Sequence, residues 1–244
     1  MATNPSSNLS KTSNFAILAL LISAAALFLS ILSLLTASGL IGNSIVSTDS
    51  SRQAETFTAF NPDAATVAAH RSELFADPES PVGGNPNGDV TVVEFFDNNC
   101  PYCREAAPML EKLVAQDHQV RVVYKEFPIL GPGSHFAAQA ALAANKQGKY
   151  LPFQKAMLSY QGSIAEDSAM SIAKQVGLDT GRLQQDMLDA KVAAELAQTH
   201  TLADTLRLSG TPSFVVGDTV FRGLVDLQTL EHEVAAARHK ASAP

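Results

Sequence analysis

The most constraining feature of this sequence is a strand–helix–strand pattern in its middle third. The run VTVVEFF at Val90–Phe96 is almost wholly apolar, as in a strand buried on both faces of a sheet. Pro101 to about His118 has apolar residues at helical spacing, and Val120–Phe127 is a second strand candidate. Such a unit predicts two parallel strands joined by a right-handed crossover. An α/β domain is therefore expected.

The pattern changes after the second strand. Residues 135–208 contain only helical stretches, separated by short Gly, Pro or Asp signals. Strand character returns at Ser213–Val216 and Thr219–Arg222, which Gly217-Asp218 joins as in a hairpin. A last amphipathic helix begins at Asp226. This order predicts one small sheet whose chain makes a detour through an inserted α-helical subdomain.

The amino-terminal region has a different character. Residues 15–37 are 23 residues without a charge. As a helix they would extend about 34 Å, which is enough to cross a bilayer core of about 30 Å. Their length favours an uncleaved transmembrane anchor. A cleaved secretion signal is the alternative, because Ala37-Ser38-Gly39 offers small residues to a peptidase. A buried helix of a soluble core is a third interpretation.

The charges beside this segment predict its orientation. Lys11 is the only charged residue in residues 1–38. The positive-inside rule then places residues 1–14 in the cytoplasm and the bulk of the chain on the other side of the membrane.

The remainder is predicted to form a tether and one folded domain. Residues 38–77 begin with a stretch rich in Ser, Thr and small residues, as in a flexible linker. One short helix is expected within this tether, from Asn61 to about Phe75. The folded domain is expected over residues 78–240, with its helical insertion at about 135–208.

Composition excludes several classes of protein. The 244 residues carry a net charge of −7, which argues against a nucleic-acid binder because such proteins present a basic face. Two cysteines are too few for a disulfide-dense scaffold or a four-cysteine zinc site.

The two cysteines lie in the motif Cys100-Pro101-Tyr102-Cys103, where the first strand gives way to the first helix. The free amide groups of a helix N-terminus stabilise a nearby anion, and the thiolate is the reactive form of cysteine. Pro101 is tolerated there because the first turn loses no helical donor. We expect Cys100 to be an exposed nucleophile and Cys103 a more buried resolving thiol.

Three other interpretations of the pair are open. A structural disulfide is possible, although so short a loop adds little stability. Two thiolates are also acceptable ligands for soft Cu(I). Two inert core cysteines are the third possibility.

Two further positions attract attention for their chemistry. Glu94 interrupts an apolar strand six residues before Cys100, and a buried acid is rare unless it is paired or functional. Lys125, in the neighbouring strand candidate, is its possible partner, although Glu94 could instead reach water at a strand end. Thr211-Pro212 immediately precedes a strand, and spacing alone favours neither a cis nor a trans bond there.

Three segments in order carry a family resemblance: VVEFFDNNCPYC, VVYKEFPILGPGSHFAA and GTPSFVVG. Together they resemble the DsbA-like branch of the thioredoxin superfamily, and in particular its ScsC- and Com1-like members. The resemblance covers about residues 78–240. It implies a thioredoxin-like fold with a helical insertion, a location in the bacterial cell envelope and no cofactor.

The resemblance also implies roles for individual residues. Cys100 and Cys103 would form a redox-active disulfide. Pro212 would be cis and face that disulfide, with Thr211 just before it. Glu94 would be the buried acid of the family, with Lys125 as its partner in proton relay.

The function expected from this resemblance is exchange of the Cys100–Cys103 disulfide with the thiols of client proteins. A reductase or isomerase kept reduced by a membrane redox partner is the alternative, since Tyr102 and Thr211 are the residues that differ from the strongly oxidising DsbA. A Cu(I)-binding protein is the third hypothesis. A monomer is expected. The residues that could contact the client are Pro101, Tyr102, Thr211, Pro128, Ile129, Leu130 and Phe136. For the last four of these, which are apolar, ordinary core packing is an equal alternative.

Overall fold

The structure is a computed structural model and describes residues 62–242. Its sheet has five strands in the order β1-β3-β2-β4-β5. Strands β2 and β3 are parallel, as predicted, and the other neighbours are antiparallel. The strands are β1 Val82–Gly84, β2 Val90–Phe96, β3 Val120–Glu126, β4 Ser213–Val216 and β5 Thr219–Arg222.

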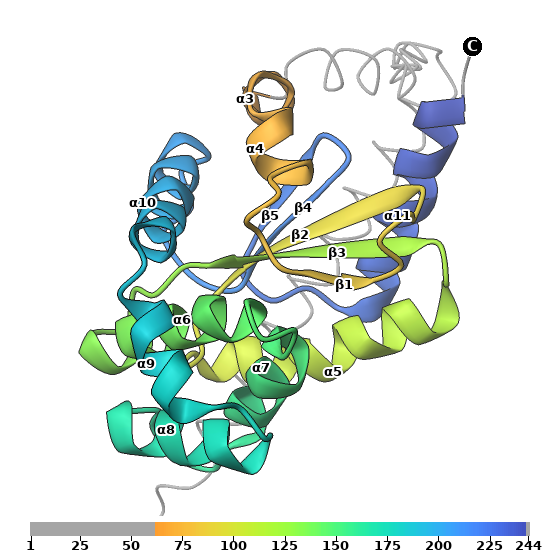
Figure 1. The fold of residues 1–244 in the computed structure, drawn as a ribbon. Helices are drawn as coiled ribbons and strands as arrows, with labels where there is room; N and C mark the ends of the chain where they lie inside the picture. The colour runs from red at the N-terminus through yellow and green to blue at the C-terminus, as the bar shows by residue number, and fades with distance from the viewer. Residues whose placement is uncertain (1–61, 243–244) are drawn as a thin grey trace, which may run out of the picture. The chain divides into compact units, whose positions relative to one another are not determined.

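The described helices follow the predicted order and carry the labels of Figure 1. That view shows α6 to α9 below the sheet, and α3 and α4 above it. The helices are α3 Pro62–Ala69, α4 Arg71–Phe75, α5 Pro101–Gln116, α6 Pro132–Asn145, α7 Tyr150–Ser159, α8 Glu166–Gln175, α9 Thr180–Met187, α10 Ala190–Thr205 and α11 Leu227–Ser242.

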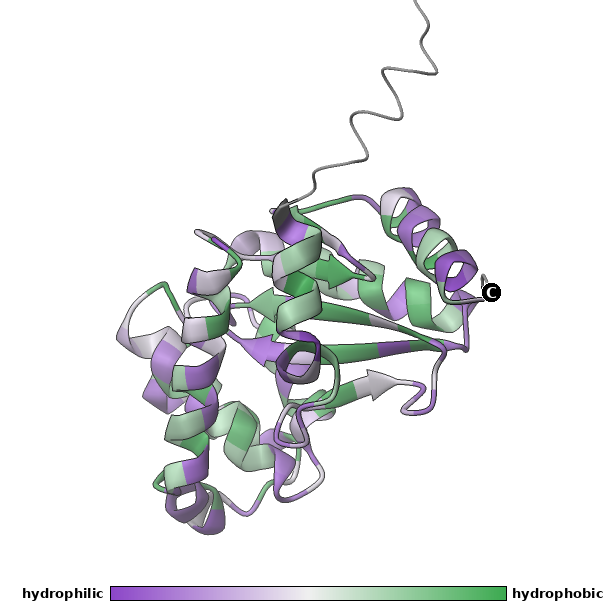
Figure 2. Cartoon of the chain, turned by 90° about the horizontal axis from the view of Figure 1, so that it is seen from above, coloured by the Kyte–Doolittle hydropathy of each residue, from purple (hydrophilic) through white to green (hydrophobic). Residues whose placement is uncertain are grey.

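Alternation along the strands creates two separate apolar layers. Val92 and Val122 face α5 and α11, whereas Val93, Phe95 and Val123 face α3, α4 and the end of α10. Successive side chains of a strand point to opposite faces, so each central strand contributes to both layers. Figure 2 shows the central strands mostly in the green of hydrophobic residues, whereas the outer helices alternate between green and the purple of hydrophilic residues.

The helical block has its own core around α6. Eight small or apolar positions of this helix are buried, and its alanines let α7, α8 and α9 approach closely. The core also includes Phe96 at the end of β2 and both cysteines. The block therefore packs against the end of the sheet where the CPYC motif lies.

Two predicted boundaries differ from the structure. The helix expected in the tether is two short helices, and Val67 and Leu74 are fully buried in the sheet layer. The folded domain therefore begins before residue 78. The helical insertion was expected to run to about residue 208. The end of α10 belongs to the sheet layer instead, because Leu202 and Leu206 pack on the sheet.

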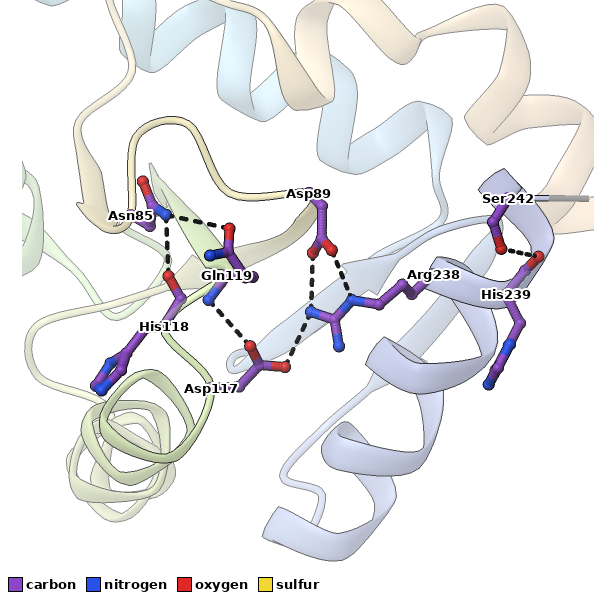
Figure 3. A network of polar contacts seen from close by, with 8 residues as sticks. All are labelled: Asn85, Asp89, Asp117, His118, Gln119, Arg238, His239 and Ser242. Carbon is purple, nitrogen blue, oxygen red and sulfur yellow. Dashed lines mark hydrogen bonds and ion pairs between the residues drawn. The ribbon is translucent and has the colours of Figure 1, made fainter.

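A network of polar contacts joins α11 to the end of the domain that lies opposite the CPYC motif (Figure 3). Arg238 donates to both carboxylate oxygens of Asp89, at 2.8 Å each, and to Asp117 at 2.9 Å. Asp89 precedes β2 and Asp117 ends α5, so one arginine connects three elements. This network lies at the start of β2, whereas Cys100 follows its end.

The predicted anchor, residues 15–37, lies outside the described residues. Among residues 62–242, no helix combines the length and the apolar character needed to cross a bilayer.

Candidate active site

Cys100 is the N-cap residue of α5 and follows the short loop that leaves β2. Pro101 takes the first helical position, as predicted. The Cys100 thiol donates a hydrogen bond to the carbonyl oxygen of Thr211 at 3.2 Å. Only 4% of Cys100 is exposed, so the expectation of an exposed nucleophile is wrong for the thiol form.

The Thr211–Pro212 peptide bond is cis, as the resemblance implied. Ser213 begins β4 directly afterwards and lies opposite Phe95 of β2. Because β2 leads to Cys100, this pairing holds the cis-proline turn beside the motif. The sheet register thus brings together two segments that are 111 residues apart.

Cys103 lies one turn further along α5 and is fully buried. Burial raises the pKa of its thiol, and the nearby Glu94 carboxylate raises it further. Both cysteines are free thiols in this structure. Both cysteines are therefore buried in the thiol form, with 4% of Cys100 and none of Cys103 exposed.

Glu94 lies on the α5 face of β2 and is buried. Burial raises its pKa from 4.5 to about 8. A carboxyl with such a pKa can hold or release a proton near neutral pH. Glu94 also raises the pKa of Cys103, so this acid belongs to the electrostatic surroundings of that thiol.

Lys125 does not partner Glu94, so that prediction is wrong. The parallel register places Lys125 opposite Phe95 and Tyr124 opposite Glu94. The lysine therefore points to the other face of the sheet. Its ammonium contacts Asp77 at 2.8 Å and Glu195 at 3.3 Å, and all three side chains are buried.

Three residues before the motif have roles that its sequence pattern did not predict. Asp97 accepts hydrogen bonds from the backbone amides of Ile129 and Leu130, at 2.8 Å and 2.9 Å, and from the Ser134 hydroxyl at 2.7 Å. Its own carbonyl accepts from the Cys100 amide. This carboxylate therefore connects the cysteine loop to the segment between β3 and α6.

Asn99 makes a similar connection to the helical block. Its side chain accepts from the Ile164 amide at 2.6 Å and donates to the Ile164 carbonyl at 3.0 Å. A run of Asp and Asn side chains that bond to local backbone is a recognisable turn signal. The Asp97-Asn98-Asn99 run could therefore have been identified from the sequence.

Of the seven expected client-contact residues, Thr211 is half-buried, and the other six divide into two groups. Pro101, Tyr102, Ile129 and Leu130 are exposed, with 60% of Tyr102 and 52% of Leu130 accessible. Pro128 is buried and Phe136 is half-buried against the core of the helical block, as the packing alternative expected. Residues that follow β3 line an open hollow of about 560 Å³: Pro128, Ile129, Gly131, Pro132, His135, Phe136 and Gln139.

No group of three or more His, Cys, Asp or Glu side chains gathers as a metal site within residues 62–242. The Cu(I) hypothesis, which needs only two thiolates, is not tested by this observation.

Similar solved structures support the same fold. A thioredoxin-like oxidoreductase from Silicibacter pomeroyi is 53% identical and superimposes with a TM-score of 0.69, covering 69% of this chain and 98% of its own. The catalytic domain of Proteus mirabilis ScsC is 28% identical, with a TM-score of 0.66 and coverage of 72% and 98%. A periplasmic thioredoxin-like protein from Salmonella enterica is 30% identical, with a TM-score of 0.65 and coverage of 70% and 97%.

Curated relatives place a similar domain in much longer proteins. Na⁺/H⁺ antiporters of two Salinispora species are 31% and 32% identical over 158 residues, which are 64% of this chain. The chain spans about a quarter of the length of these relatives. The family model of the DSBA-like thioredoxin domain matches residues 91–235, from β2 to α11. The chain therefore belongs to the DSBA-like thioredoxin domain family.

Proposed function

We propose that this protein is a thiol–disulfide oxidoreductase of the bacterial envelope, which exchanges its Cys100–Cys103 disulfide with the thiols of client proteins. One observation carries the proposal: Cys100 is the N-cap residue of α5 and its thiol donates to the Thr211 carbonyl, beside cis-Pro212, while Cys103 is fully buried one turn further along the helix. The helix N-terminus stabilises an anionic sulfur at this position.

The proposed reaction has two exchange steps. A client thiolate attacks Cys100 of the disulfide, so that a mixed disulfide forms and Cys103 leaves with the electron pair of the broken bond. A proton then neutralises Cys103, whose raised pKa favours the thiol. A second client thiolate attacks the client sulfur and releases Cys100 as a thiolate. The client dithiol is oxidised by two electrons and the enzyme disulfide is reduced by two.

The side chains around Cys100 suit this sequence. Glu94 has a pKa of about 8, so it can supply the proton that Cys103 takes up and recover it when the disulfide re-forms. Tyr102 and Leu130 present apolar surface beside the motif. We propose that they contact the apolar residues that flank a client cysteine, together with Pro101, Thr211 and the half-buried Phe136.

The test is the redox equilibrium of the full chain with glutathione, followed by mass labelling of free thiols. We expect a defined equilibrium between the dithiol and the disulfide. The Cys103→Ser variant should accumulate a mixed disulfide when its Cys100 thiolate attacks a client peptide that carries a disulfide and releases one client thiolate, and Cys100→Ser should not. Equal trapping by both variants would overturn the roles assigned to the two sulfurs, and absence of exchange in the wild type would overturn the function.

The same measurement decides between the two directions of electron flow. A pair that is easily reduced supports the oxidase, whereas a pair that resists reduction and recovers a scrambled substrate supports the reductase or isomerase. We propose that the protein acts as a monomer anchored through residues 15–37, with a membrane redox partner that resets the pair. Recovery of the full chain in the soluble fraction after cell lysis would contradict the anchor.

A further inference from the structure

A second acid lies buried behind the motif and takes no part in the exchange described above. Glu126 is the last residue of β3 and is 1% exposed. The register places it opposite Phe96, two residues along from the Glu94–Tyr124 pair. Glu94 and Glu126 therefore share the face of the sheet that packs against α5 and Cys103.

The contacts of Glu126 link three parts of the domain. Its two carboxyl oxygens bond to the Asn98 amide nitrogen and to the Tyr150 hydroxyl, each at 2.9 Å. Asn98 lies in the loop between β2 and Cys100, and Tyr150 is the first residue of α7. The carboxyl thus ties the cysteine loop to both the sheet and the helical block.

No positive charge balances this carboxyl among the residues that the structure describes. The ionisable groups that face it are Glu94 from β2, Asp97 from the cysteine loop, Tyr124 from β3 and Tyr150 from α7. Lys125, its neighbour in the chain, is on the other face of the sheet. A buried carboxylate without a cation is costly, so the neutral acid is favoured.

The pKa of Glu126 is raised well above its ordinary range in agreement with this geometry. Burial is the main cause, and the negative charges of Asp97 and Glu94 add to it. The hydrogen bonds from Tyr150 and Asn98 offset only part of the increase.

Asn98 can bond to this carboxyl in either protonation state. Its amide nitrogen donates to Glu126, while its amide oxygen is buried without a hydrogen-bond partner in the described residues. Rotating the amide by half a turn would present that oxygen to a protonated Glu126 and break no hydrogen bond of the oxygen. The contact between loop and strand therefore survives protonation.

We propose that Glu126 is a positioning residue of the dithiol site, held as a neutral acid at pH 7, whose hydrogen bond to Asn98 fixes the loop that carries Cys100. The inference rests on the proposed function. As a neutral group, Glu126 holds the loop without adding a buried negative charge to the face of the sheet that packs against α5.

The first test is the titration of Glu126 by ¹³C NMR of the carboxyl carbons in the reduced full chain. The spectrum of Glu126→Gln identifies the signal by its absence. We expect Glu126 to remain protonated at pH 7 and below. A midpoint near the ordinary value of about 4.3 would overturn the proposal. This readout does not depend on exchange activity, so it stands even if the wild type fails to equilibrate with glutathione.

The second test compares three variants by the rate at which iodoacetamide alkylates Cys100 at pH 7. Glu126→Leu keeps the size and removes both hydrogen bonds, and we expect it to slow the reaction about tenfold, as for the loss of a buried hydrogen bond. Glu126→Gln is neutral and can still bond to Asn98, so it should recover most of the rate. Glu105→Gln, on the exposed side of α5, is the control for loss of a carboxylate.

Each outcome of this comparison decides the question. If Glu126→Leu reacts like the wild type, Glu126 does not position the loop. If Glu126→Gln is as slow as Glu126→Leu, the carboxylate charge matters and the neutral acid is wrong. Near-ultraviolet circular dichroism of the buried tyrosines reports whether Glu126→Leu has folded, and if it has not, the titration and Glu126→Gln decide.

Discussion

Burial alone changes the chemistry of Glu94. The residue lies in the middle of β2, in contact with apolar layers rather than water, and its pKa rises from 4.5 to about 8. An acid whose pKa is higher in the folded than in the unfolded state favours folding most below the unfolded value. That contribution is lost as the pH rises to the folded value. The protonation of Glu94 therefore makes the free energy of unfolding of the domain depend on pH.

We predict that Glu94→Gln weakens this pH dependence. Between pH 4.5 and about 8 the folded wild type keeps a proton that the unfolded chain has released. Its free energy of unfolding should therefore fall by about 1.4 kcal/mol per pH unit from this residue. Glutamine cannot ionise, so that part of the slope disappears. Urea unfolding of the reduced protein at pH 5, 6, 7 and 8 measures it.

The matched control is Glu105→Gln, because Glu105 is exposed on α5. It should keep the slope of the wild type. The slope that remains in Glu94→Gln belongs to other buried acids, Glu126 among them. An unchanged slope in Glu94→Gln would mean that Glu94 is ionised in the folded protein at neutral pH.

Individual residues differed in how well the sequence predicted them. The location of both cysteines at the start of a helix and of Glu94 within an apolar strand follows from the motif and from the break in the apolar run, although Cys100 is buried rather than exposed. Lys125 was misplaced because a shift of one residue in a strand moves a side chain to the other face, and the sequence does not state the register. The bonds of Asp97 to the 129–130 backbone depend on tertiary contacts, which local patterns do not reveal.

At the scale of elements, the buried lysine joins three parts of the chain. Lys125 on β3 contacts Asp77 from the segment before β1 and Glu195 from α10, and Ser80 donates to Glu195 at 2.9 Å. Burial works to raise the pKa of Asp77, yet the hydrogen bond from Lys125 helps to keep it below its ordinary value. The cluster therefore depends on the ammonium group at its centre.

We predict that Lys125→Met destabilises the domain by about 3–5 kcal/mol, because two buried carboxylates lose their cation. Urea unfolding at pH 7 measures the change, with Lys112→Met on the exposed face of α5 as control. Neutralising the partners as well, in Asp77→Asn/Lys125→Met/Glu195→Gln, should restore much of the loss. A folded Lys125→Met with a shifted glutathione equilibrium and normal stability would instead support the proton-relay role that the register argues against.

The segment between β3 and α6 gives a prediction about clients. Leu130 is held beside the cysteine loop by Asp97 and is half-exposed. Leu130→Ser should lower kcat/KM for an apolar cysteine peptide about fivefold, since part of a leucine side chain is no longer buried on binding. The rate with glutathione, which is small and polar, should not change. Steady-state oxidation of both substrates provides the comparison.

Leu188→Ser is the matched control, because Leu188 is 86% exposed and lies in the turn between α9 and α10. It should leave both substrates unaffected. An equal effect of the two substitutions, or none from Leu130→Ser, would remove Leu130 from the client surface.

The elements themselves were predicted well where a pattern was long. Four strands and the order of the helices follow from apolar runs and helical spacing. β1 was missed because it has only three residues, two of them glycine, in a segment dense with turn signals. β1 forms by pairing with β3, which is a contact between distant parts of the chain that local sequence patterns do not predict.

At the scale of the whole molecule, the redox state of one pair should influence the stability of the domain. The sheet and the helical block meet at the cysteines, which belong to the core of the block. A disulfide across three residues constrains very little of the unfolded chain, so it adds little stability by entropy. The thiol form, in contrast, keeps the hydrogen bond from Cys100 to the Thr211 carbonyl.

We therefore predict that the dithiol form of the full chain is more stable than the disulfide form. The difference in the free energy of unfolding between the two forms equals the difference in disulfide stability between the folded and unfolded states, and about 30 mV corresponds to about 1.4 kcal/mol. Urea midpoints at pH 7 with and without reductant measure it. The Cys100→Ser/Cys103→Ser variant should give the same midpoint in both conditions. If the disulfide form is the more stable one, folding protects the disulfide, electrons leave the dithiol readily, and the protein acts as a reductase rather than an oxidase.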